Sequence, residues 1–227
     1  MFNDVESLLQ GLIEKVERRF YGKYRGYVES NKDPKHLGRL RLRIPSVLGK
    51  DTITGWALPC TPYGGAAGEG MLFVPEKDAG VWVEFEEGDL EFPVWVGAYW
   101  SEPDGTSEMP LHNKADGSEE TEYQDTGDSE DKKLTRKIIR TKKGHTIQIE
   151  DKDGEELITI VHWKSRDDDE KNVITMDSNG IKLTDYTQNV IEMKNDAFTL
   201  TSKVPFKIDA AGQPVEIVAD TVDFTKG

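Results

Sequence analysis

Cysteine is almost missing from this sequence, since Cys60 is the only one. A single cysteine excludes an intrachain disulfide and a cysteine-cluster zinc site, and within "LPCTPY" we expect Cys60 to be a small buried side chain. Long apolar runs are missing as well, and none comes near the about 20 residues that a membrane-spanning helix needs. The first residues are acidic where a secretory signal is basic. We therefore expect a protein made in the cytoplasm without Sec export.

Positive charge and histidine are also scarce. The 29 Lys and Arg residues face 43 Asp and Glu residues, which gives a formal net charge of -14. Such a chain is poorly suited to bind nucleic-acid phosphates or anionic lipid, because both require a basic surface. The four histidines, His36, His112, His145 and His162, lack the neighbouring carboxylate and nucleophile that a hydrolase needs. The sequence therefore predicts no enzyme, no cofactor and no bound metal.

Residues 1–20 carry the pattern of a short amphipathic helix. Apolar residues recur there at spacings of three and four, with charged residues on the other face. This apolar stripe either packs on the next domain of the chain or lies on a partner protein or on symmetry mates. The candidate partner contacts are Leu8, Leu9, Leu12, Ile13 and Val16.

Residues 21–100 change to a period of two, which is typical of strands. "GRLRLRIP" and "GVWVEFEEGD" alternate apolar with charged residues, and turns rich in Gly, Pro and Asp separate five or six such segments. This pattern predicts a small closed or Greek-key barrel. The arginine face could bind nucleic acid, but we favour a solvated face on which Arg41 or Arg43 pairs with Glu84 or Glu86.

Residues 101–133 are rich in carboxylates, Gly, Pro and Ser and have almost no apolar side chain. Their carboxylates lack the regular every-second-position spacing of a calcium loop. We therefore expect an exposed acidic linker over 101–133.

Residues 134–227 return to short alternating strands, such as "HTIQIED", "NVITMD", "GIKLTD" and "AFTLTS". Each has one apolar face of two or three side chains, and repeats of this kind cannot bury that face alone. The chain is also lean in apolar residues, at 36%. Either three chains wind around a common axis and meet through these faces, or a single chain forms a β-solenoid.

Four segments occur in a distinctive order within the predicted barrel: "YRGYVESNKDP", "LGRLRLRIPS", "TGWALP" and "FVPEKDAGVWVEFEEGDLEFPVWVG". With them, residues 21–100 resemble the OB-fold domain of the phage baseplate assembly V and VgrG spike family. After the linker, "TKKGHTIQIEDKDGEELITI" resembles the segment that begins the triple-stranded β-helix of these spikes, with His145 as a structural hydrogen-bonding residue. The resemblance implies an all-β fold, with an OB-fold barrel over 21–100 and an intertwined trimeric β-helix or prism over 134–227.

The resemblance implies a function as the central spike, or baseplate needle, of a contractile tail or injection particle. A homotrimer would link a tail hub protein above the barrel to the tip, and would contact the target membrane transiently when sheath contraction drives it through the envelope. A phage tail, a tailocin, an extracellular injection system and a type VI apparatus all fit. The candidate trimer-core residues are Ile147, Ile149, Ile181, Leu183, Phe198 and Leu200.

Two features of related spikes are missing. The acidic linker is too short to hold the lysozyme domain that some carry, and no histidine follows His162 to form a His-x-His metal tip. An unsealed tip would expose Val222 and Phe224 and predicts a separate PAAR-type tip protein. The alternatives are an OB-fold binding module for single-stranded nucleic acid or glycan, and an enzyme with an unrecognised site.

Overall fold

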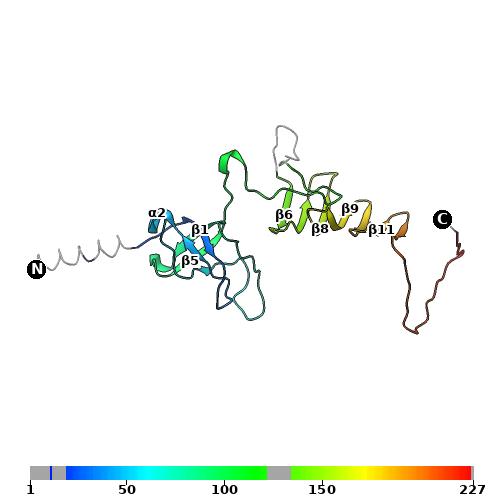
Figure 1. The fold of residues 1–227 in the computed structure, drawn as a ribbon, viewed down its shortest axis with the longest axis horizontal. Helices are drawn as coiled ribbons and strands as arrows, with labels where there is room; N and C mark the ends of the chain where they lie inside the picture. Colours follow the sequence, from blue (N-terminus) through cyan, green and yellow to red (C-terminus); the bar gives the residue numbers. More distant parts are fainter. Residues whose placement is uncertain (1–10, 12–18, 122–133, 226–227) are drawn as a thin grey trace, which may run out of the picture. The chain divides into compact units, whose positions relative to one another are not determined.

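The computed structural model describes residues 11, 19–121 and 134–225 of the chain. The predicted helix over 1–20 lies almost entirely outside these residues. The chain divides into two compact units, with the boundary between Met109 and Pro110 (Figure 1). Both are built from strands, so the predicted all-β class is confirmed.

The first unit is a five-stranded sheet that closes on itself. Its strands are β1 (Tyr24–Ser30), β2 (Arg41–Arg43), β3 (Leu58–Pro59), β4 (Gly80–Phe85) and β5 (Pro93–Ala98). The sheet order is β2-β1-β4-β5-β3, and an isolated bridge between Leu40 and Ala57 brings β2 back to the start of β3. A five-stranded Greek-key ring of this kind is the OB barrel. The short helices are α2 (Pro45–Leu48), η1 (Glu86–Gly88) and η2 (Pro103–Gly105).

The barrel buries its own apolar residues. Alternation along β1, β2 and β4 turns every second side chain inward, and these side chains form one cluster with Trp95 and Phe85. Its fully buried members are Val28, Leu40, Leu42, Ile44, Ala57, Val81 and Val83. This unit therefore has a closed core of its own.

The loop after β1 is organised by the carboxylate of Asp33. This carboxylate pairs with the Arg39 guanidinium at 2.6 Å and accepts backbone N–H bonds from Lys35 at 3.0 Å and Leu37 at 2.8 Å. The Arg39 hydrogen bonds, followed by those backbone N–H groups, lower the pKa of Asp33. In the loop "NKDPKHLGR", backbone N–H groups that pair with no neighbouring strand therefore donate to one carboxylate.

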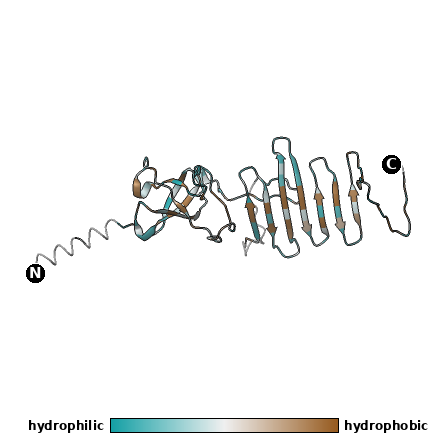
Figure 2. Ribbon diagram, turned by 90° about the horizontal axis from the view of Figure 1, so that it is seen from below, coloured by the Kyte–Doolittle hydropathy of each residue, from teal (hydrophilic) through white to brown (hydrophobic). Residues whose placement is uncertain are grey.

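The second unit is a seven-stranded antiparallel sheet in which the strands follow chain order. They are β6 (Arg136–Arg140), β7 (Thr146–Glu150), β8 (Leu157–Ser165), β9 (Glu170–Asp177), β10 (Gly180–Thr184), β11 (Val190–Lys194) and β12 (Phe198–Thr201). Figure 2 shows them side by side, with hydrophobic and hydrophilic residues alternating along each strand. Gly180, the first residue of β10, has a φ of +144°, and a Cβ there would collide with the carbonyl oxygen of Met193.

The strands of this unit stop earlier than the sequence pattern predicts. Strands were expected in "FKIDA", "VEIVAD" and "VDFTK", but residues 202–225 contain no helix or strand. These segments keep the alternation of strands, yet each lacks a neighbouring strand to pair with in the single chain. A β-strand requires such a partner for its backbone N–H and C=O groups.

The acidic segment also differs from the expected exposed linker. Residues 110–121, which we call the strap, belong to the second unit and lie against its sheet, with His112 and Asn113 buried. The rest of the expected linker contains residues outside the described ranges. Composition alone missed the strap because it does not reveal the hydrogen bonds between Asn113 and the Gln148 amide that hold it.

Candidate assembly interface

One face of the second sheet carries two continuous rows of apolar side chains. Because residues paired across antiparallel strands point to the same face, the registers of the seven strands define these rows. One row is Ile149, Ile158, Met176, Ile181, Met193 and Phe198; the other is Ile139, Ile147, Ile160, Ile174, Leu183, Ile191 and Leu200. At the usual spacing of strands, the longer row extends over roughly 29 Å. We call these side chains the apolar face.

The apolar face is the one that the chain leaves open. On β7, Ile147 and Ile149 are 46% and 40% exposed, whereas the intervening Gln148 is 2% exposed. Toward the other end, Phe198 and Leu200 are 65% and 55% exposed. This is the reverse of a soluble one-sided sheet, which covers its apolar side and leaves its polar side in water. The apolar face therefore has the composition of a protein interior without the covering layer.

The opposite, polar face of β6 to β9 is covered by the strap. The amide of Gln148 behaves like a short piece of strand: its Oε1 accepts the N–H of Asn113 at 2.9 Å, and its Nε2 donates to the Asn113 carbonyl at 3.1 Å. Glu119 of the strap forms ion pairs with both Arg140 and Arg166. Burial lowers the pKa of His112, and the Arg136 cation adds to this effect. The strap thus fixes the polar face within one chain.

Polar side chains border the apolar face at one margin. His145 and His162 stack with ring centroids 4.9 Å apart. The Nδ1 atom of His145 accepts the backbone N–H of Trp163 at 3.1 Å, so His145 is a hydrogen-bonding residue as the resemblance implied. The Nδ2 atom of Asn172 lies 3.2 Å from Nδ1 of His162. The apolar face is therefore a narrow stripe, two residues wide on most strands.

Basic side chains on the outer surface of the barrel pair with carboxylates of the same chain. Arg43 pairs with Glu29 at 3.0 Å and with Asp78 at 3.4 Å, so the predicted partners Glu84 and Glu86 are wrong. The reason is the strand order, since β2 pairs with β1 and not with β4. Glu84 instead pairs with Lys23 at 3.0 Å.

An aromatic pair on the barrel is covered by an arginine of the same chain. The guanidinium of Arg25 lies 5.6 Å from the ring centroid of Trp82 and 5.4 Å from that of Tyr99. Burial, together with the neighbouring Tyr27, raises the pKa of Tyr99 to about 12. Arg25 therefore covers part of the Trp82 and Tyr99 ring faces on which a nucleic-acid base could stack.

Side chains suited to metal binding are not grouped in the described part of the chain. Within residues 11, 19–121 and 134–225, no three His, Cys, Asp or Glu side chains lie close enough to hold a metal ion. Cys60 is exposed, so its predicted burial is wrong: it follows the last residue of β3 and begins the long loop that leaves the barrel. None of the helices within those residues is long and apolar enough to cross a membrane.

The structure places the predicted contact residues in three ways. Ile147, Ile149, Ile181, Leu183, Phe198 and Leu200 all lie on the apolar face. Val222 and Phe224 are 50% and 92% exposed, and Leu8, Leu9, Leu12, Ile13 and Val16 lie outside the described residues. The prediction missed Ile139, Ile158, Ile160, Ile174, Met176, Ile191 and Met193, although the same alternation of apolar and polar residues could have found them.

The geometry defines an all-β protein with an OB barrel followed by a sheet whose apolar face is open. Residues 24–100 match the family model described as the type VI secretion system/phage-baseplate injector OB domain. The match identifies the barrel as an OB domain of this kind, and it supports a structural role in a phage baseplate or a related injection system. A comparison with curated proteins gives no match.

Proposed function

We propose that this protein is the central spike of a contractile tail or injection particle, built from three copies of the chain. The observation that carries the proposal is the open apolar face. Three such faces turned toward a common axis would remove their side chains from water, and each Å² of apolar surface buried contributes roughly 25 cal/mol. A narrow apolar face suits this arrangement, because each of the three sheets has to supply only a third of the side chains that fill a narrow shared core.

The arrangement also fits the mechanical task of a spike. Backbone hydrogen bonds between neighbouring strands hold the sheet of each chain together, and the strap binds its polar face through Gln148 and Glu119. With the apolar faces inside, polar side chains would face the water. We propose that such a needle transmits the load of sheath contraction and pierces the target envelope, with transient contact with its membrane.

Two further partners belong to this proposal. The apolar stripe formed by Leu8, Leu9, Leu12, Ile13 and Val16 would bind the tail hub protein. Val222 and Phe224, both exposed, would contact a PAAR-type tip protein. Pull-down of the full chain with a PAAR protein from the same gene cluster tests the second contact, and replacing Phe224 by Asp should abolish it. Unchanged binding by that variant would remove Phe224 from the proposal.

The assembly itself is tested by two neighbouring substitutions on β10. Ile181 lies on the apolar face and Lys182 on the polar face of the same strand. A carboxylate at Ile181→Asp would be buried without a partner in the trimer, at a cost of several kcal/mol in each copy. We expect sedimentation at micromolar concentration to give a trimer for Lys182→Asp and single chains for Ile181→Asp. Equal masses for the two variants would contradict the proposed interface.

A further inference from the structure

The alternation of strands continues beyond β12, but the pairing does not. Val204, Phe206 and Ile208 alternate with polar or short residues and are 48%, 67% and 65% exposed. Within the described residues 202–225, a backbone hydrogen bond links Gln213 to Ala210, and none holds residues 204–208 to the sheet. The segment 204–208, which we call the C-terminal arm, therefore has the pattern of a strand without a partner.

Two features turn the arm out of the sheet directly after β12. The side-chain oxygen of Asn189, in the turn between β10 and β11, accepts the backbone N–H of Lys203 at 2.7 Å and lies 3.3 Å from the Ser202 hydroxyl. Asn189 is itself fixed by Asp185, whose carboxylate accepts its backbone N–H at 2.9 Å and its side-chain amide at 2.8 Å. Pro205 then has no N–H to donate to a neighbouring strand.

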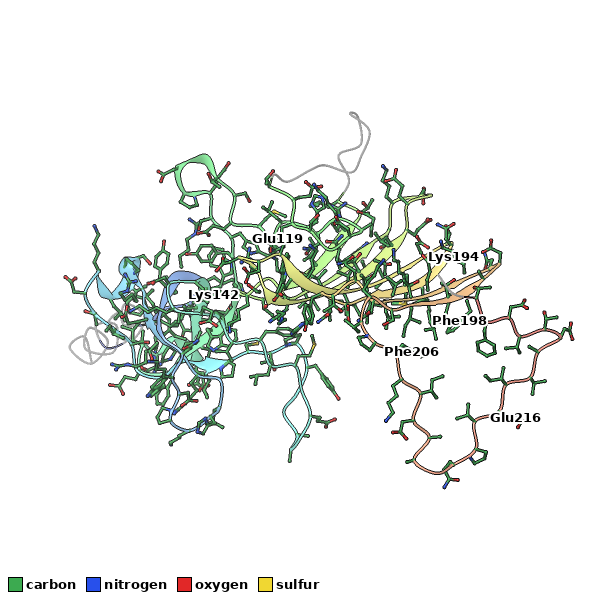
Figure 3. All side chains as sticks on the ribbon, turned by 45° about the vertical axis from the view of Figure 1, so that its right-hand side comes forward. Glu119, Lys142, Lys194, Phe198, Phe206 and Glu216 are labelled. Atoms are coloured by element: carbon green, nitrogen blue, oxygen red, sulfur yellow. The ribbon has the colours of Figure 1, made fainter. Side chains whose placement is uncertain are left out.

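The arm turns toward the apolar face and not toward the polar one. Together with Ile174, Leu183, Ile191 and Leu200 of the apolar face, Val204 and Phe206 line a groove of about 970 Å³. Figure 3 shows Phe206 below the ribbon of the sheet, on the chain that follows the last strand. In one chain the groove stays open, since the arm lines one side of it and does not fill it.

We propose that the C-terminal arm of each copy fills the groove of a second copy, so that exchange between copies begins at Ser202. This inference rests on the proposed trimer. It adds the position along the chain at which strand pairing within one copy gives way to packing between copies. The pattern of the arm fits the groove, because Val204, Phe206 and Ile208 can point toward apolar side chains while Lys203 and Lys207 remain in water. Asn189 is the positioning residue that directs the arm.

Engineered disulfides in the full chain distinguish exchange from packing within one chain. In a Cys60→Ser background, the pair Leu183→Cys and Phe206→Cys joins groove and arm. Under exchange each copy is linked to the next, so oxidation should convert most chains to a covalent trimer on a non-reducing denaturing gel. The matched control, Lys182→Cys with Phe206→Cys, places the first thiol on the opposite face of β10 and should leave single chains.

The remaining outcomes separate this inference from the proposed function. A trimeric mass in solution with a disulfide inside each chain, or with free thiols, would overturn the exchange and leave the spike intact. A monomeric or dimeric mass would overturn the spike itself. Hydrogen exchange on the unaltered protein is independent of the variants: amides of 206–208 should be protected in the trimer, and Asn189→Ala should reduce that protection. Immediate exchange of these amides in a trimer would also contradict the proposal.

Discussion

The barrel and the second sheet use the same alternation of apolar and polar residues in opposite ways. In the barrel, Leu42 and Val83 are fully buried by strands of the same chain. In the second sheet, the chain buries Gln148 and Thr159 and leaves Ile147 and Leu200 open. A closed barrel can bury its own apolar side chains, whereas a single open sheet cannot bury both of its faces. The comparison therefore separates a unit that buries its own apolar side chains from a sheet whose apolar face stays open in the single chain.

The largest expected effect comes from a matched pair of leucines, one in each region. Leu42 is fully buried in the barrel, and Leu200 is 55% exposed in the single chain. We expect Leu42→Ala and Leu200→Ala each to lower the free energy of unfolding by about 2–5 kcal/mol per chain, because the proposed trimer would bury Leu200 as the barrel buries Leu42. Denaturant titration at one protein concentration measures both.

The two leucine variants should also differ in their dependence on concentration. Mass action links the stability of a trimer to its concentration. The denaturant midpoint of Leu200→Ala should therefore rise as the protein concentration increases, whereas the midpoint of the barrel transition in Leu42→Ala should stay constant. A change of less than about 0.5 kcal/mol for Leu200→Ala, typical of surface sites, would remove the distinction between the regions.

Removing the amide of Gln148 should have a smaller effect, confined to the second sheet. Gln148→Leu leaves the buried N–H and C=O of Asn113 without their partners, at a cost of about 1–3 kcal/mol. Hydrogen exchange should show faster exchange of the strap amides and unchanged barrel amides. The exposed Gln213→Leu serves as the control. Equal strap protection in both variants would mean that Gln148 does not hold the strap.

The loop of the barrel should give a pH-dependent difference. The pKa of Asp33 is lowered in the folded chain, chiefly by Arg39. Its contribution to stability is therefore present above the ordinary carboxyl pKa of about 3.9 and is lost as the pH falls below that value toward the folded pKa. We expect Asp33→Asn to lower the barrel unfolding temperature at pH 7 and to flatten its decline below pH 4.

A thermal scan of the barrel between pH 3 and pH 7 measures the Asp33 effect. Asp51→Asn, at an exposed position, is the control and should follow the unaltered chain. An Asp33→Asn curve parallel to that of the unaltered chain would show that the loop carboxylate is not the group that titrates.

The smallest effect is expected for an exposed ion pair on the barrel. Lys23 and Glu84 lie 3.0 Å apart, with side chains 58% and 44% exposed. Water and salt screen such a pair, so Lys23→Ala should change the free energy of unfolding by less than about 1 kcal/mol in a denaturant titration. A larger loss would indicate that this part of the barrel surface is covered in the assembled protein.

Sequence patterns predicted the barrel well, because alternation in "GRLRLRIP" and "GVWVEFEEGD" is resolved by strands of one chain. They did not give the pairing order, and the partner of Arg43 was wrong for that reason. The strap was missed since it is held by the Gln148 amide and by Glu119, which composition does not reveal. The strands expected beyond Ser202 follow the pattern but have no partner strand in a single chain, so pattern alone could not place them.

The central claim is that the apolar face of the second sheet is covered by other copies of the same chain. The mass of the purified, unaltered protein in dilute solution, measured by light scattering, tests it most directly. We predict about three times the chain mass of 25.6 kDa. A stable single chain, or a dimer, would contradict the account.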